Sequence, residues 1–235
     1  MVGRRILKYV WVALLACAAF ALALLGAFWW WLTPDIARID GVVALASRQP
    51  VSDHVVAAIV AVEDPQHFQR SSPLYPRAAV QAMLRARSKN ELCCAATLTN
   101  QLVKSMLQEA LPSRNWLRTS KEVILAAVVD AHYTRREIAR SYAQVVYLGT
   151  NSGRPIIGVH EGSRLYFARR PSELSDDQVA VLVAMIHQPA ALSPRVHTEV
   201  ATARRVKALE AMRDHHVISQ PAFEKAVRRL YSARS

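Results

Sequence analysis

The sequence VVAAIVAVEDP, residues 55–65, is apolar on nearly every side until it reaches an acidic pair. A helix without a polar face is expected inside a protein core. Pro65 disfavours helical geometry at the residue before it, so the helix should end on Glu63 and Asp64. The sequence therefore predicts a buried central helix that carries two carboxylates at its C-terminal end.

The segments after this helix also have helical patterns, and strand-like alternation is scarce. Two capping boxes, Thr134–Glu137 and Ser175–Gln178, mark places where helices begin. Further helices are predicted at 97–109, 118–133, 135–148, 198–215 and 221–231. We expect an all-α fold with irregular connections.

The N-terminal part of the chain has the features of a membrane anchor. Residues 9–32 form an uncharged apolar run, and a helix of about 20 such residues spans a bilayer. Arg4, Arg5 and Lys8 precede the run, so the positive-inside rule sends the bulk of the chain outward. A cleaved signal peptide is the alternative, although its apolar region has about 7–15 residues. The predicted organisation is a cytoplasmic N-terminus at 1–8, a transmembrane helix at 9–32, a stalk at 33–44 and an extracytoplasmic domain at 45–235.

The formal charge of +12 predicts an anionic partner. For a protein held at a membrane, lipid headgroups, pyrophosphate lipids or anionic wall polymers fit better than nucleic acid. Of the three cysteines, Cys17 lies in the apolar run and Cys93 and Cys94 are adjacent. No long-range disulfide framework is therefore available to the outer domain, and the redox state of Cys93 and Cys94 stays open.

Two groups of residues have the chemistry of a catalytic site. Glu63 and Asp64, flanked by apolar residues at a helix end, suit a general base or acid. The second group shares one helical face by its spacing and consists of Arg114, Arg118, Lys121 and Glu122. A cationic stripe of this kind stabilises a leaving diphosphate. By spacing alone, a solvated helix end and a solvated helix face are the better explanations of these residues.

Five motifs follow one another along the chain. They are AIVAVEDPQHF at 58–68, TLTNQLVK at 97–104, SRNWLRTSKE at 113–122, IARSYAQVVYLG at 138–149 and the run at 158–194 that ends in PAALSP. In this order they resemble glycosyltransferase family 51, and ordered motifs are more specific than any single one. The resemblance covers roughly residues 45–230. It implies a lysozyme-like glycosyltransferase domain of a monofunctional peptidoglycan transglycosylase, without a transpeptidase domain, which polymerises lipid II.

The resemblance also assigns roles to single residues. Glu63 is expected to be the general base that takes the proton from the acceptor sugar, and Glu122 matches the second catalytic glutamate. The expected substrate-binding residues are Asp64, Phe68, Thr97, Gln101, Lys104, Arg114, Arg118 and Lys121. Among these, the lysines and arginines would hold the donor pyrophosphate. The family further implies a divalent cation, Mg²⁺ or Mn²⁺, near that pyrophosphate.

Partners and location follow from the same resemblance. Lipid II and the growing glycan chain are the expected substrates, and cell-division or elongation proteins are candidate partners. The domain is expected on the periplasmic side of the bacterial inner membrane, held by a single-pass anchor. No nucleic-acid partner is expected.

Several positions depart from the family's pattern. Residues 94–96 read CAA where a Gly-Gly-Ser run is usual, and residues 71–75 lack the usual His-x-Gly segment. Thr119 stands where lysine is usual, and Gln144 where asparagine is usual. Two alternatives therefore stay open. One is a catalytically weak or inactive paralogue that binds lipid II, glycan or cell-wall synthesis proteins; the other is a lysozyme-like hydrolase, which the cationic stripe disfavours.

Overall fold

The computed structural model describes residues 2–69, 97–110, 116–196 and 198–232. The chain divides into two compact units, Met1–Arg38 and Ile39–Ser235. Its elements are α1 (Val2–Arg48), α2 (Asp53–Glu63), α4 (Leu98–Ala110), α5 (Trp116–His132), α6 (Arg135–Val145), β1 (Tyr147–Asn151), β2 (Arg154–Ile157), α7 (Val159–Phe167), the 3₁₀ turn η1 (Pro171–Glu173), α8 (Asp176–Ala184), α9 (Pro189–Leu192), α10 (Glu199–Asp214) and α11 (Gln220–Ser232). The expected helical fold class is confirmed.

Some of the predicted features lie outside the described residues. They are Cys93, Cys94, Arg114 and the departures at 71–75 and 94–96.

α1 contains the apolar run but does not end with it. Residues 33–44, predicted as a stalk, are helical, and Pro34 lies inside the helix. Large apolar side chains of the run are exposed, among them Phe20 and Trp30. Within the described parts of the chain, α1 holds the one stretch, starting at Leu14, that is long and apolar enough to cross a membrane. The helix is consistent with a single-pass membrane anchor.

α2 is the buried central helix that the sequence predicts. Most of its side chains are buried, and the side chain of Ser52 caps its start by accepting a hydrogen bond from the N–H of Val55. The helix ends at Glu63, and Asp64 has a non-helical backbone with φ −156° and ψ 70°. This end is the one that Pro65 predicts.

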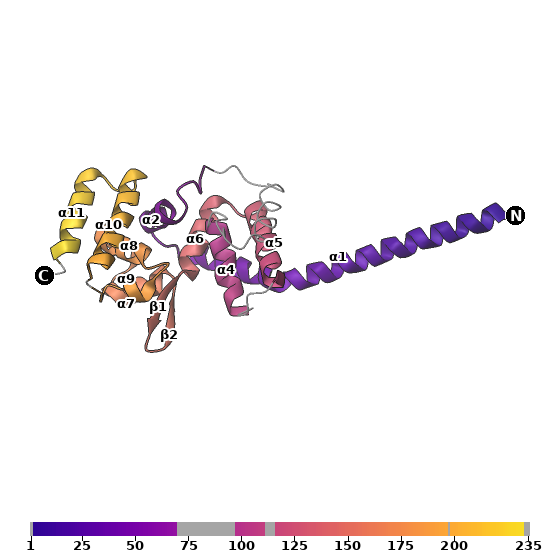
Figure 1. The fold of residues 1–235 in the computed structure, drawn as a ribbon, viewed down its shortest axis with the longest axis horizontal. Coiled ribbons are helices and arrows are strands. Elements are labelled where there is room, and N and C mark those ends of the chain that lie inside the picture. Colours follow the sequence, from indigo (N-terminus) through magenta and orange to yellow (C-terminus); the bar gives the residue numbers. More distant parts are fainter. Residues whose placement is uncertain (1, 70–96, 111–115, 197, 233–235) are drawn as a thin grey trace. The chain divides into compact units, whose positions relative to one another are not determined.

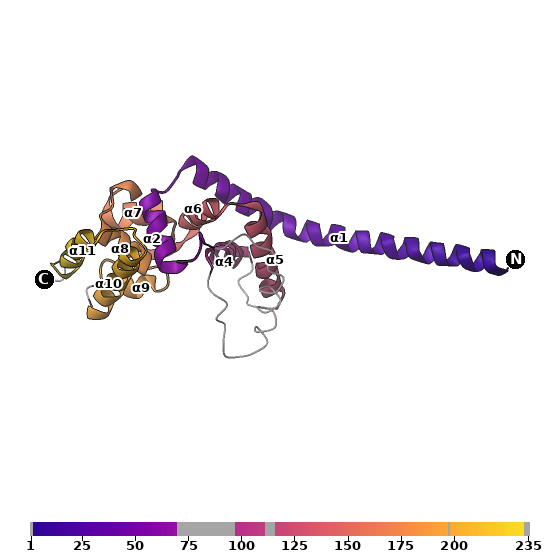
Figure 2. The ribbon, with the colours of Figure 1, turned by 90° about the horizontal axis from the view of Figure 1, so that it is seen from above.

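α2 contacts helices of two groups (Figure 1). α4 packs against α5 and α6, and α10 packs against α8 and α11. α2 contacts α6 from the first group and α8 and α10 from the second; Figure 2 shows the same neighbours from above. The C-terminal end of α2 is therefore reached by side chains from both groups, as the contacts of Glu63 below demonstrate.

One short hairpin interrupts the helices. The helix predicted at 135–148 ends at Val145, because β1 and β2 follow as an antiparallel pair. Gly158, directly after β2, has φ +82°, and a Cβ there would lie 2.4 Å from the main-chain oxygen of Gln144. A glycine is thus required where the chain returns to the end of α6 and begins α7.

Candidate active site

The carboxylate of Glu63 lies buried at the C-terminal end of α2. Its side chain is only 2% exposed. Oε2 accepts a hydrogen bond from Nε2 of Gln101 on α4 at 3.1 Å, and Nε2 of His187, which follows α8, lies 2.9 Å from the same oxygen. Tyr142 on α6 donates to Oε1 of Gln101 at 2.5 Å. The glutamate is thus held by a chain of contacts from three further parts of the fold.

Tyr142 fixes the direction of the Gln101 amide. Because the tyrosine hydroxyl donates to Oε1, the amide nitrogen is left to donate to Glu63, and a carboxylate only accepts. Burial, and next the charge of Glu63, raise the pKa of Tyr142 well above its ordinary value. Tyr142 therefore remains a protonated donor at any physiological pH.

His187 is a site residue that the sequence reasoning missed. Its hydrogen bond with Glu63 raises the pKa of its imidazole, and the Coulomb attraction of the same carboxylate adds to this effect. Burial and the charge of Lys104 on α4 act in the opposite direction. His187 lies inside the motif at 158–194, but the motif gave it no role, because its position relative to Glu63 depends on how α8 packs against α2.

Asp64, which follows Glu63 in the chain, is also buried. Its Oδ2 accepts from the N–H of Leu98 at 3.1 Å, at the first residue of α4. A carboxylate at a helix N-terminus satisfies an unpaired N–H and complements the helix dipole. The structure therefore gives Asp64 a positioning contact, which ties the end of α2 to the helix that carries Gln101; its substrate-binding role stays a prediction.

His67 completes this connection and was also missed. Its side chain is 1% exposed, with Nδ1 3.5 Å from Oδ2 of Asp64. Its Nε2 lies 2.9 Å from the carbonyl oxygen of Arg135 at the start of α6, so Nε2 carries a proton and donates. Phe68 packs edge-on against His67, with ring centroids 5.2 Å apart, and is half exposed. This segment anchors the end of α2 to α6.

The other predicted residues on α4 differ in what they contact. Thr97 is an N-cap, because its Oγ1 accepts from the N–H of Asn100 at 3.2 Å. Lys104 is exposed and lies three residues after Gln101, on the same side of the helix. Its charge lowers the pKa of His187.

α5 carries the cationic residues, and they are not on a solvated face. Arg118 and Lys121 are only 6% and 7% exposed. Nε of Arg118 donates to Oε1 of Glu122 at 2.9 Å, a pair that is also expected on a solvated helix face. Buried cations are uncommon in proteins unless they are paired or used. Since α5 packs against α4, this cationic group lies on the helix next to the one that carries Gln101 and Lys104.

The described residues do not form a metal cage of their own. Within them, no three His, Cys, Asp or Glu side chains gather closely enough to hold an ion. Glu63 already accepts from two donors and Glu122 is bonded to Arg118. The expected Mg²⁺ or Mn²⁺ therefore does not fit a site made of these residues alone, and it remains a prediction.

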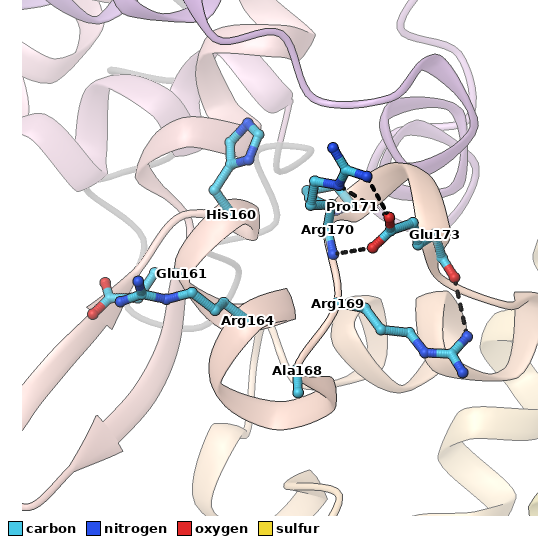
Figure 3. A pocket seen from close by; sticks show the side chains of 8 residues that line it. All are labelled: His160, Glu161, Arg164, Ala168, Arg169, Arg170, Pro171 and Glu173. Carbon is cyan, nitrogen blue, oxygen red and sulfur yellow. Dashed lines mark hydrogen bonds and ion pairs between the residues drawn. The ribbon is translucent and has the colours of Figure 1, made fainter.

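A separate concavity of about 540 Å³ lies between α7 and η1 (Figure 3). Nε and Nη2 of Arg170 bond to the Glu173 carboxylate at 3.0 and 2.7 Å, and Nη1 of Arg169 donates to the Glu173 carbonyl at 3.3 Å. The hydrogen bond with Arg170 lowers the pKa of Glu173. These contacts cap the turn before α8, so a structural role accounts for this arginine pair.

A buried carboxylate bonded to α4, with buried cations on the helix that packs against α4, has the chemistry of transferase sites that release an anionic leaving group. The transglycosylase family profile matches residues 40–213, which is most of the chain. The chain belongs to the transglycosylase family.

Relatives support this membership. The chain is 31% identical to penicillin-binding protein 1B of Vibrio cholerae over 183 residues, covering 77% of this chain and 23% of that protein. It is 30% identical to penicillin-binding protein 1A of Aquifex aeolicus, covering 81% of this chain and 26% of that protein. It is also 30% identical to penicillin-binding protein 1B of Escherichia coli, covering 75% of this chain and 21% of that protein. The chain thus spans about a quarter of the length of these relatives.

Proposed function

We propose that the chain is an active peptidoglycan glycosyltransferase that polymerises lipid II, with Glu63 as the general base. The observation that carries this proposal is the Glu63 carboxylate, buried at a helix end and held by the Tyr142–Gln101 chain of hydrogen bonds. A general base must be held within hydrogen-bonding reach of the proton it takes. Membership of the transglycosylase family supplies the class of substrate.

In the proposed reaction, the 4-hydroxyl of the acceptor sugar attacks the anomeric carbon of the lipid-linked donor. A new carbon–oxygen bond forms, the bond from the anomeric carbon to the pyrophosphate breaks, and the hydroxyl proton passes to Glu63. The pyrophosphate leaves with its lipid, and Lys104, Arg118 and Lys121 stabilise its charge. Within the described residues, neither donor on Glu63 takes Oε1, so that oxygen is the one to accept the proton.

The proposed location is the outer face of the cytoplasmic membrane. The apolar part of α1 would cross the bilayer once, with Arg4, Arg5 and Lys8 on the cytoplasmic side. On the outer side of the membrane, the domain would bind lipid II and the growing glycan and contact wall-synthesis proteins. Protease added to intact spheroplasts should digest the domain after α1, and protection of the domain would reverse the topology.

The test of the function is a polymerisation assay. The full-length protein in detergent, with labelled lipid II and Mg²⁺ or Mn²⁺, should form glycan polymer. Glu63→Gln should abolish the polymer, whereas Glu210→Gln, a matched change at an exposed glutamate of α10, should not. Absence of polymer with either metal and with lipid II of several chain lengths would refute the proposal.

The alternative hypothesis, an inactive paralogue, predicts that no polymer forms in the same assay. It rests on the substitutions at 71–75 and 94–96, which lie outside the described residues. If it is correct, Glu63→Gln leaves the cellular phenotype intact. A hydrolase, in contrast, would release soluble fragments from purified sacculi, and it has no use for the buried cations of α5 because its substrate lacks a pyrophosphate.

A further inference from the structure

The contact between His187 and Glu63 joins an exposed residue to a buried one. Nε2 of His187 lies 2.9 Å from Oε2 of Glu63, yet the histidine side chain is 69% exposed and the glutamate side chain 2% exposed. Gln101, the other donor to the same oxygen, is linked inward to the buried Tyr142. Of the two side chains bonded to Oε2, His187 is therefore the one that faces solvent.

We propose that His187 is a latch on the general base, which pairs with Oε2 of Glu63 in the resting enzyme and must leave before the carboxylate regains the full negative charge that draws the acceptor proton. The inference rests on the proposed function, since it assumes that Glu63 takes the proton. His187 occurs in the loop between α8 and α9, so its side chain can move without displacing a helix. Gln101, fixed by Tyr142, keeps the carboxylate in place when the histidine leaves.

The chemistry of the contact explains why it would act as a latch. Gln101 and His187 both bond to Oε2, so together they occupy its two lone pairs. An imidazolium also neutralises the carboxylate charge that attracts a proton. A charge-assisted hydrogen bond is about twice as strong as a neutral one, so loss of the proton from His187 weakens the contact.

The direction of the pH dependence follows from the charged groups around the histidine. Glu63 at the end of α2 raises the pKa of His187, and Lys104 on α4 lowers it; Tyr142 on α6 acts through Gln101 as a neutral donor. The net effect is a raised pKa. The ion pair is therefore fully present below about pH 6.5 and is lost as the pH rises through the raised pKa of His187. The latch is closed in acid and opens toward alkaline pH.

The first experiment is a pH–rate profile of lipid II polymerisation by the full-length protein in detergent. His187→Ala removes the contact, and His187→Gln keeps a neutral donor but no charge. At pH 5.5 both variants should polymerise at least about 5-fold faster than the unsubstituted protein, with the ratio falling toward one at pH 8.5. His215→Gln, at an exposed histidine after α10, serves as the matched control and should leave the profile unchanged.

A uniform change in rate at every pH, or an unchanged profile, would overturn the latch, because a purely structural histidine would give either result. A second measurement does not depend on activity. The pKa of His187, followed by NMR of ¹³C-labelled histidine in the full-length protein, should fall in Glu63→Gln. If no polymer forms at any pH, the proposed function fails, while a fall in this pKa still supports the contact and an unchanged pKa refutes it.

Discussion

Substitution of Tyr142 by phenylalanine tests how Glu63, the proposed general base, is held. Tyr142 is 3% exposed, and its hydroxyl donates to Oε1 of Gln101, so the substitution leaves that acceptor without its donor. A buried polar group without its partner costs about 1–3 kcal/mol. In a protein of this size each kcal/mol lowers the Tm by about 2–4 °C, so a fall of about 2–12 °C is expected.

Activity should fall as well, because the Gln101 amide is then free to turn its oxygen toward Glu63. If the same 1–3 kcal/mol is lost from the transition state, polymerisation slows by about 5- to 150-fold. Initial rates with labelled lipid II and thermal melting in detergent measure the two effects. Tyr231→Phe, at an exposed tyrosine of α11, is the control.

A double-mutant cycle makes the test stricter. Tyr142→Phe and Gln101→Ala should be non-additive, with a coupling energy of about 0.5–3 kcal/mol, because both remove the same hydrogen bond. A Tyr142→Phe protein that melts and polymerises like the unsubstituted one would refute the reasoning. Additive effects would show that Tyr142 does not act through Gln101.

Three further predictions concern the surroundings of the site. Asp64→Asn keeps an acceptor for the α4 N-terminus but removes the charge, so the Tm should fall by about 2–6 °C in a melting experiment. An unchanged Tm would mean that the charge of Asp64 gains no stability from the dipole of α4. Arg118→Met should leave Glu122 without this donor and reduce kcat for polymerisation by about 100-fold. A change in KM alone would show that Arg118 does not stabilise the transition state. Gly158→Ala should destabilise the fold more than Gly153→Ala. Both glycines have positive φ, but only at Gly158 would the added Cβ lie 2.4 Å from a main-chain oxygen. Equal melting points of the two variants would contradict this steric argument.

The parts of the fold set by local sequence were predictable. A run that is apolar on nearly every side located α2, and Pro65 located its end. The Thr134–Glu137 capping box is confirmed, with both of its reciprocal hydrogen bonds present at the start of α6. Local patterns are reliable here because the unpaired backbone N–H groups at a helix start are hydrogen-bonded by residues within one turn of it.

The features that depend on distant contacts were not predictable. Nothing in the spacing shows that His187 approaches Glu63, which lies more than a hundred residues earlier in the chain. The hairpin after Val145 was missed because its two strands are short and its partner residues are set by pairing, not by periodicity. The burial of Arg118 and Lys121 depends likewise on the packing of α5, so spacing alone favoured a solvated face.

The adjacent carboxylates of Glu63 and Asp64 have different surroundings because the helix ends between them. Glu63 is the last residue of α2 and Asp64 has a non-helical backbone, and their side chains bond to different residues. Asp64 bonds the N-terminus of α4, and that bond positions the helix from which Gln101 reaches Glu63. Asp64 thus has a structural contact that helps to hold the proposed general base, Glu63, in place. Pro65 enforces this separation, because a helix that continued through Asp64 would lose the geometry that directs its carboxylate to α4.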